Sequence, residues 1–149
     1  MFSDDLDKAL ATFVLANGAA ATGQKVTIFF TFWGLNVIKR LSKTKTEKDI
    51  YGKMFGMMLP SSSQKLKLSK MSMGGIGGKM MRHIMGKKGI ESLESLRQQA
   101  LENGVEFIAC QMSMDVMGVK REELLDEVTV GGVATYMERA DNANVNLFI

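Results

Sequence analysis

Hydrophobic residues recur at two different spacings along this chain, and the change from one spacing to the other divides it into elements. From Asp5 to Thr22 they fall at helical spacing, after an aspartate-rich start and before Gly23, which predicts a first helix. Lys25–Phe32 is a run of β-branched and aromatic residues without clean alternation, a pattern typical of a strand covered on both faces. Leu35–Leu41 then predicts a short helix just past that strand.

The rest of the chain continues this alternation. Helical spacing and glycine stops predict helices in Ile90–Asn103, Met112–Met117, Arg121–Glu127 and Val133–Ala140. Short apolar runs predict strands in Val105–Ala109, Val128–Val130 and Val145–Ile149. Because helices alternate with strands, we expect a three-layer α/β/α domain with a mostly parallel sheet of about four or five strands.

The predicted sheet lacks a complete first strand. A helix comes before the first predicted strand, and Met1-Phe2 is at most a stub of the strand that should lead into it. Either the sheet has lost an edge or the true start of the protein lies upstream. We expect all 149 residues to form one domain, since this length is enough to bury a core.

The segment from Ser42 to Gly89 departs from the rest in composition. It holds 8 of the 15 glycines, 8 of the 13 methionines and the only proline. Between Asp49 and Glu91 there are 8 basic residues and no acidic one, so the remainder of this chain of net charge +3 carries −5. We interpret residues 51–88 as a basic insert of short helices, rich in methionine and glycine, in an acidic domain.

Three kinds of contact would suit this insert. Methionine side chains adapt to varied surfaces, so a subunit interface, a protein-docking surface and a membrane-surface contact are all open. The run Gly74–Gly78 invites comparison with phosphate-binding loops, but no strand precedes it and no P-loop pattern follows. The Met-Ser-Met stretches at residues 71–73 and 112–114 would suit copper(I), although a core or interface explains them better, and we expect no metal.

Cys110 is the only cysteine and lies between a predicted strand and a predicted helix. At that junction the backbone N–H groups of Gln111, Met112 and Ser113 would stabilise a thiolate, the nucleophilic form of the thiol. The residues alone leave two interpretations open, because free cysteine is also among the most buried residue types. Cys110 is either a reactive thiol or a small buried hydrophobic side chain.

Few other groups are available to assist the thiol. His83, the sole histidine, lies in the basic insert and would reach Cys110 only if the insert folded over it; otherwise it is a solvated surface residue. Asp115 would orient a partner group or simply suit the first turn of a helix. Gly131 and Gly132 open a later helix and offer a second position that suits an anion.

These residues limit the chemistry. One cysteine excludes an internal disulfide framework and a zinc site of clustered thiolates, and ordinary hydrolysis is not expected without a base or a metal. A single thiol can still accept and donate sulfur, or form a mixed disulfide. The sequence shows neither a signal peptide nor a run long and apolar enough to span a membrane. We therefore expect a reduced, cytoplasmic protein, at most peripheral to a membrane.

Four stretches carry a family resemblance: SDDLDKALATFVLANGAAATG, FFTFWGLNVIKR, CQMSMDVMG and VGGVATYMERA. Together they resemble the DsrE/DsrF-like family, and most of all its branch of sulfurtransferases often called peroxiredoxin-like, from about Ser3 to Ile149. The resemblance implies a flavodoxin-like α/β/α domain and homo-oligomers, with trimers or hexamers expected. It also implies a persulfide on Cys110. Related sulfur-relay subunits carry a persulfide on a cysteine that ends a strand and precedes a helix and a glycine, and Cys110 and Gly118 match that arrangement. The insert is unlike those compact subunits.

The favoured hypothesis is therefore a sulfur carrier or sulfurtransferase with Cys110 as the persulfide site. It would exchange sulfur with a donor or acceptor protein or with a low-molecular-weight persulfide, and we expect neither a cofactor nor a nucleic-acid partner. One alternative is a thiol redox protein that works with a separate disulfide or coenzyme A disulfide reductase. The other is a non-enzymatic oligomeric adaptor that docks through its Met-rich insert.

Overall fold

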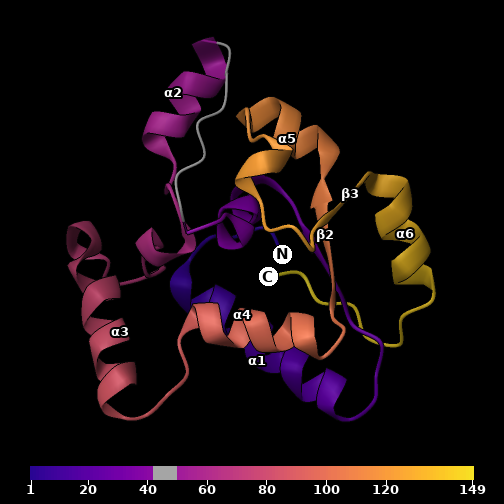
Figure 1. Ribbon diagram of the computed structural model, residues 1–149, viewed down its shortest axis with the longest axis horizontal. Helices are drawn as coiled ribbons and strands as arrows, with labels where there is room; N and C mark the ends of the chain where they lie inside the picture. The colour runs from indigo at the N-terminus through magenta and orange to yellow at the C-terminus, as the bar shows by residue number, and fades with distance from the viewer. Residues whose placement is uncertain (42–49) are drawn as a thin grey trace.

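A computed structural model of the protein describes residues 1–41 and 50–149 (Figure 1). Their α-helices are α1 (Leu6–Ala21), α2 (Ile50–Met58), α3 (Ile76–Lys87), α4 (Leu93–Glu102), α5 (Gln111–Met117) and α6 (Val133–Asp141). Their strands are β1 (Thr27–Phe30), β2 (Glu106–Cys110) and β3 (Thr129–Gly131). Short 3₁₀ helices are η1 (Phe32–Ile38), η2 (Ser63–Lys65), η3 (Met73–Gly75) and η4 (Arg121–Glu123).

The three strands form one parallel sheet in which β2 is central. Thr27 to Phe30 of β1 pair with Glu106 to Ala109, and the last three residues of β2 pair with β3. The strands predicted within Lys25–Phe32, Val105–Ala109 and Val128–Val130 are thus confirmed, as is the mixed α/β class with a parallel sheet. The arrangement is consistent with a flavodoxin-like fold. The described residues contain three strands rather than the four or five expected.

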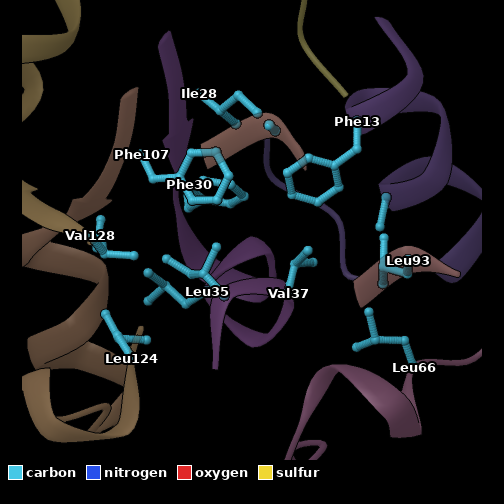
Figure 2. Packing of buried hydrophobic residues seen from close by; sticks show 14 of the residues in the cluster. Phe13, Ile28, Phe30, Leu35, Val37, Leu66, Leu93, Phe107, Leu124 and Val128 are labelled. Atoms are coloured by element: carbon cyan, nitrogen blue, oxygen red, sulfur yellow. The ribbon is translucent and has the colours of Figure 1, made fainter. Parts of the chain in front are cut away.

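One face of the sheet carries most of the core. Ile28 lies opposite Phe107 in the β1–β2 register and Phe30 lies two residues further on, so alternation places all three on one face. Phe13 of α1 contacts Phe30 and Phe107, with ring centroids 6.5 and 5.7 Å apart. Figure 2 shows this aromatic group with Leu93 of α4 beside it. Buried aromatic contact of this kind fixes α1 on the sheet.

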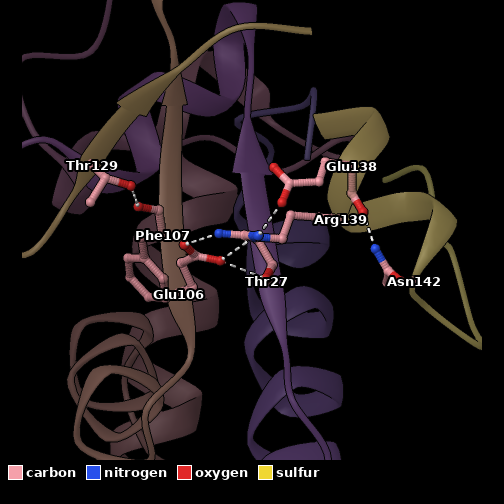
Figure 3. Close-up of polar contacts among 7 residues, drawn as sticks. All are labelled: Thr27, Glu106, Phe107, Thr129, Glu138, Arg139 and Asn142. Atoms are coloured by element: carbon pink, nitrogen blue, oxygen red, sulfur yellow. Dashed lines mark hydrogen bonds and ion pairs between the residues drawn. The ribbon is translucent and has the colours of Figure 1, made fainter. Parts of the chain in front are cut away.

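The other face is covered more thinly, by α6. No residue of α6 is buried. Tyr136 lies against Phe29, with ring centroids 5.4 Å apart, and the Nε atom of Arg139 is 3.0 Å from a carboxylate oxygen of Glu106 (Figure 3). The hydrogen bond from Arg139 lowers the pKa of the Glu106 carboxyl. A ring contact and a partly exposed ion pair therefore hold α6, with little apolar burial to help them.

Met1 lies along the outer edge of β1. Its nitrogen donates to the Phe29 carbonyl at 2.7 Å, and its carbonyl accepts from the Thr31 N–H at 3.0 Å. These two bonds have the slanted pattern of a parallel pair. Met1 therefore takes the position beside β1 that a longer first strand would fill.

The strand expected at Val145–Ile149 does not form, and that prediction is wrong. Residues 145–148 are exposed and irregular, and the Ile149 carbonyl accepts from the Phe2 N–H at 2.6 Å. The composition of the segment favours a strand, but a strand forms only where a neighbour offers paired N–H and C=O groups. Met1 already occupies the free edge of β1, so the C-terminal segment reaches Phe2 instead.

The helix predicted at Leu35–Leu41 begins earlier and is tighter than expected. It is the 3₁₀ helix η1, which ends at Ile38, and Phe32 at its start has a φ angle of +47°. The Gly34 N–H donates to the Thr31 carbonyl three residues back, at 3.0 Å, and to the Phe2 carbonyl at 2.8 Å. Contact with the start of the chain thus competes with regular α-helical bonding here.

The helix predicted at Arg121–Glu127 is also shorter, because only η4 forms there. The Arg121 guanidinium donates to the carbonyl oxygens of Leu125, Asp126 and Val128 at 2.8, 2.8 and 2.7 Å. The chain after η4 is therefore wrapped around its own arginine, and those carbonyls are turned away from a helical direction.

Residues 50–88 contain α2, η2, η3 and α3, which lie on the left of the sheet in Figure 1. The side of α3 that faces the protein includes Gly77, Gly78 and Met85. Among the residues that the structure describes, no helix is long and apolar enough to cross a membrane.

The contact between η1 and Met1 generates a stability prediction. A Cβ atom on Gly34 would lie 2.4 Å from the Met1 carbonyl oxygen, and both sides of that contact are backbone, so relief requires the chain itself to move. We expect Gly34→Ala to lower the free energy of unfolding by about 1–3 kcal/mol, as measured by chemical denaturation.

Gly18→Ala is the matched control. Gly18 is an exposed residue within α1, and a Cβ atom there would meet nothing within 4 Å. Alanine should raise the free energy of unfolding by about 0.5–1 kcal/mol, because it restricts the unfolded chain and favours helix. Equal effects of the two substitutions would contradict the proposed backbone clash.

Candidate functional site

The three strands end together at one edge of the sheet, where a parallel α/β fold usually places its ligand site. Phe30, Cys110 and Gly131 are the last residues of β1, β2 and β3. Cys110 and Gly131 are register partners. The cysteine therefore lies in the middle of this edge, with a glycine beside it in the neighbouring strand.

Cys110 is both the last residue of β2 and the N-cap of α5. Residues 106, 108 and 110 alternate onto one face, and Glu106 on that face binds α6. The Cys110 side chain therefore belongs to the face that α6 covers rather than to the aromatic core. Only 2% of its surface is exposed. In this single chain the thiol is buried, as the more conservative interpretation of the sequence expected, yet it occupies the strand-to-helix junction that a reactive thiol requires.

The position of α5 is fixed by buried polar and apolar contacts. The Ser113 hydroxyl is fully buried and lies 2.7 Å from the Thr31 hydroxyl, just past the end of β1. Met114 and Met117 are buried on the same helix. A hydroxyl pair and two thioether side chains thus hold α5 across the ends of β1 and β2, and so fix the backbone that follows Cys110.

A close backbone contact fixes the end of α5. Gly118 has a φ angle of +61°, and a Cβ atom on it would lie 2.4 Å from the Cα atom of Gly52 in α2. Two glycines therefore let α2 and α5 approach with no side chain between them. The sequence identified Gly118 as a helix stop. It gave no reason to select Gly52, because the partner of a glycine contact carries no chemical signal of its own.

The structure brings together most of the residues that the sequence selected. Gln111, Met112 and Ser113 form the first turn of α5, where helix N–H groups lack intrahelical partners. Gly131 lies opposite Cys110, and Gly132 is the N-cap of α6. The backbone groups proposed to stabilise an anion therefore come from two helix starts at one edge of the sheet.

The other two side chains that the sequence selected, Asp115 and His83, are not directed at the Cys110 thiol. Asp115 is exposed and accepts a hydrogen bond from the Gln111 side chain at 2.9 Å, one turn back on the same helix. His83 is exposed on α3, and Figure 1 shows α3 well apart from β2 and α5. The described part of the chain contains no group of three or more His, Cys, Asp or Glu side chains that could hold a metal ion.

A solvent-open pocket of about 460 Å³ lies beside α5, and sequence reasoning missed it. Its lining includes Gln111 and Asp115 of α5, Val130 of β3, and the cations Lys120 and Arg121. Cys110 is not among its lining residues. A basic pair directly after a helix stop has no distinctive sequence pattern, so only the fold reveals that these cations lie at the carboxyl edge of the sheet.

Comparisons with known proteins identify the family of this chain. The model of the DsrE/DsrF/DrsH-like family matches residues 1–148. The chain is 44% identical over 149 residues to the uncharacterized protein YrkE of Bacillus subtilis, covering 100% of this chain and 93% of that protein. It is 37% identical over 148 residues to the sulfur carrier protein DsrE2 of Allochromatium vinosum, covering 97% of this chain and 91% of that protein. The resemblance carried by the four sequence stretches is confirmed, and the protein belongs to the DsrE/DsrF/DrsH-like family.

Proposed function

We propose that this protein is a sulfur carrier that holds a persulfide on Cys110. The observation that carries the proposal is the place of the chain's only cysteine, at the carboxyl end of the central strand, in a protein 37% identical to one named a sulfur carrier. Membership of the family supports a role in sulfur trafficking. The donor and acceptor would be a partner protein thiol or a low-molecular-weight persulfide.

The proposed reaction is a thiol exchange that needs no outside oxidant. The Cys110 thiolate attacks the outer sulfur of a donor persulfide, and a new S–S bond forms while the donor's S–S bond breaks. The donor leaves as a thiolate and Cys110 becomes the persulfide. An acceptor thiolate then attacks the outer sulfur of that persulfide and restores the Cys110 thiolate, so sulfur, charge and electrons balance over the cycle.

Burial of the thiol adds a requirement for local opening. With 2% of its surface exposed, Cys110 cannot meet a donor unless a neighbouring element moves. The elements that begin beside it are α5 and α6, and α6 has no buried residue. Elements with little apolar burial open at the lowest free-energy cost, so we propose that α6 moves and uncovers the thiol.

The first prediction of the proposed function concerns the sulfur adduct. After incubation with a persulfide donor, intact-mass spectrometry of the protein should show one added sulfur atom, about 32 Da, on Cys110. The Cys110→Ser variant should show no added mass after the same treatment. Circular dichroism should match for the two proteins, because serine preserves the size of the side chain and the N-cap position.

Other outcomes of that experiment are informative. A sulfenic acid or mixed disulfide on Cys110 in place of added sulfur would support the thiol redox alternative. The absence of any adduct would leave the adaptor alternative. An adduct that persists in Cys110→Ser would contradict the assignment of the site.

The second prediction tests the support of α5. Gly118→Ala should lower the free energy of unfolding by about 1–3 kcal/mol more than Gly104→Ala. Both glycines have positive φ, but only the Cβ atom at Gly118 would meet a neighbour, Gly52. Displacement of α5 should also increase the alkylation rate of Cys110, which Gly104→Ala should leave unchanged. Equal behaviour of the two variants in both measurements would contradict the role of the glycine contact.

The third prediction concerns assembly. Val133, Tyr136 and Met137 lie on one side of α6 by their helical spacing and are 62%, 38% and 49% exposed. Clustered exposed apolar residues usually mark an interface, so we propose a closed homo-oligomer, a trimer or hexamer by family resemblance. Light scattering should give a mass several times 16.4 kDa. A monodisperse species of the monomer mass would contradict this proposal.

A further inference from the structure

The outward side of α3 carries an apolar stripe next to a cationic one. Ile76, Met80 and Ile84 are spaced four residues apart and are 64%, 46% and 40% exposed. Lys79, His83 and Lys87 follow at the same spacing and are exposed. Residues four apart in a helix lie above one another on one side, so the two stripes run side by side along α3.

Backbone contacts on the inward side set the orientation of this helix. A Cβ atom on Gly77 would lie 2.1 Å from the Met71 carbonyl oxygen, and one on Gly78 would lie 3.0 Å from the Leu66 carbonyl oxygen. Met85 is buried on the same side. The preceding chain therefore packs directly on the glycine side of α3, and the apolar stripe must lie away from it.

Polar contacts also attach α3 from its inward side. Arg82 lies 3.2 Å from Glu94 of α4 and donates to the Ser63 carbonyl in η2 at 2.8 Å. The ion pair and hydrogen bond of Arg82 thus add to the glycine and Met85 contacts on the inward side of α3. Ile76, Met80 and Ile84 all remain more than a third exposed, although they are apolar.

The segment that carries the apolar stripe contains charged residues of one sign only. No acidic residue occurs from residue 50 to residue 90, and Glu94, the near carboxylate on α4, is paired with Arg82. Two further methionines precede the helix, Met71 at 70% exposure and Met73 at 58%. Thioether side chains adapt to varied surfaces, and the lysines beside the apolar stripe can extend their ammonium groups past it toward anions.

We propose that the outward side of α3 binds an anionic lipid surface, with the apolar stripe among the headgroups and the lysines on lipid phosphates. An amphipathic helix with a basic polar side is the form that lies in a membrane interface. Figure 1 shows α3 at an outer edge of the molecule, where it can meet an extended surface. This surface lies apart from the sheet edge that holds Cys110, so the proposal goes beyond the sulfur-carrier function and does not depend on it.

Sedimentation of the full-length protein with phosphatidylcholine vesicles, with and without phosphatidylglycerol, tests the proposal. The protein should sediment with the anionic vesicles and much less with the neutral ones. Lys79→Gln with Lys87→Gln should weaken binding about 25-fold, since each lysine near an anionic surface contributes about a factor of five. Binding should also weaken as the Debye length falls from about 10 to about 3 Å with added salt.

Matched variants distinguish a specific effect of the α3 lysines from a general loss of positive charge or of stability. Lys79→Arg with Lys87→Arg should bind normally, and Lys25→Gln with Lys120→Gln removes two exposed lysines elsewhere and should change binding less than about twofold.

The apolar stripe is tested in the same way. Ile76→Ser, Met80→Ser and Ile84→Ser together should weaken binding by about tenfold or more. Val14→Ser with Leu15→Ser changes two exposed apolar residues of α1, which are 58% and 52% exposed, and should have no effect. Circular dichroism should match for all variants.

Several results would overturn the proposal. Absence of sedimentation with anionic vesicles would do so, as would equal losses for the α3 variants and their controls. If the lysines matter but the apolar stripe does not, α3 is a surface for an acidic protein or another polyanion instead of a lipid contact. If the α3 variants change the oligomer mass in light scattering, the stripe is an interface between copies of this chain.

Discussion

Pairing of β2 on both sides is the constraint on which the rest of the structure depends. β1 and β3 each pair with β2 in parallel, and no pair of the described strands forms without it. Parallel strands cannot be joined by a tight turn, so each connection must pass over a face of the sheet and bring a helix with it. The same pairing places the end of β2 between two other strand ends. A buried core and a central position for Cys110 therefore follow from one arrangement.

The two faces of this sheet differ in how strongly they are held. On one face, aromatic rings from α1, β1 and β2 pack together, with Phe30 and Phe107 5.4 Å apart between ring centroids. On the other, α6 is attached by Arg139, Glu106 and a ring contact. Apolar burial contributes about 1.5–3 kcal/mol for each large side chain, whereas an exposed ion pair contributes at most about 1 kcal/mol. We therefore expect the face that includes Cys110 to open more readily than the aromatic one.

The spacing of hydrophobic residues correctly predicted the buried strands and the amphipathic helices. The apolar runs before Thr31 and Gln111 mark buried strands, and the stripe that includes Leu93 marks a helix, because burial on a regular element leaves a period in the sequence. The prediction of a C-terminal strand was wrong, because strand pairing depends on which sheet edge is free. Met1 already occupies the free edge of β1.

Features that depend on contacts with distant residues could not be predicted from the sequence. The wrapping of residues 125–128 around Arg121 replaces a predicted helix through side-chain contacts that no periodicity encodes. At the candidate site, the sequence selected Cys110 and the glycines near it, because a lone thiol at a strand end is a chemical signal. It could not place Lys120 beside the sheet edge or show that the thiol is buried, since both depend on three-dimensional packing.

The contact between Gly52 and Gly118 has a consequence for how this sequence can change. A Cβ atom at Gly118 would lie 2.4 Å from the Cα atom of Gly52, so a larger residue at Gly118 requires α2 and α5 to move apart. Which residue can occupy position 118 therefore depends on the backbone at position 52, although 65 residues lie between the two positions in the sequence. A change in the Met- and Gly-rich segment that presses α2 against Gly118 should therefore displace the end of α5 as well. The segment with the most unusual composition is therefore mechanically linked to the turn that follows the only cysteine.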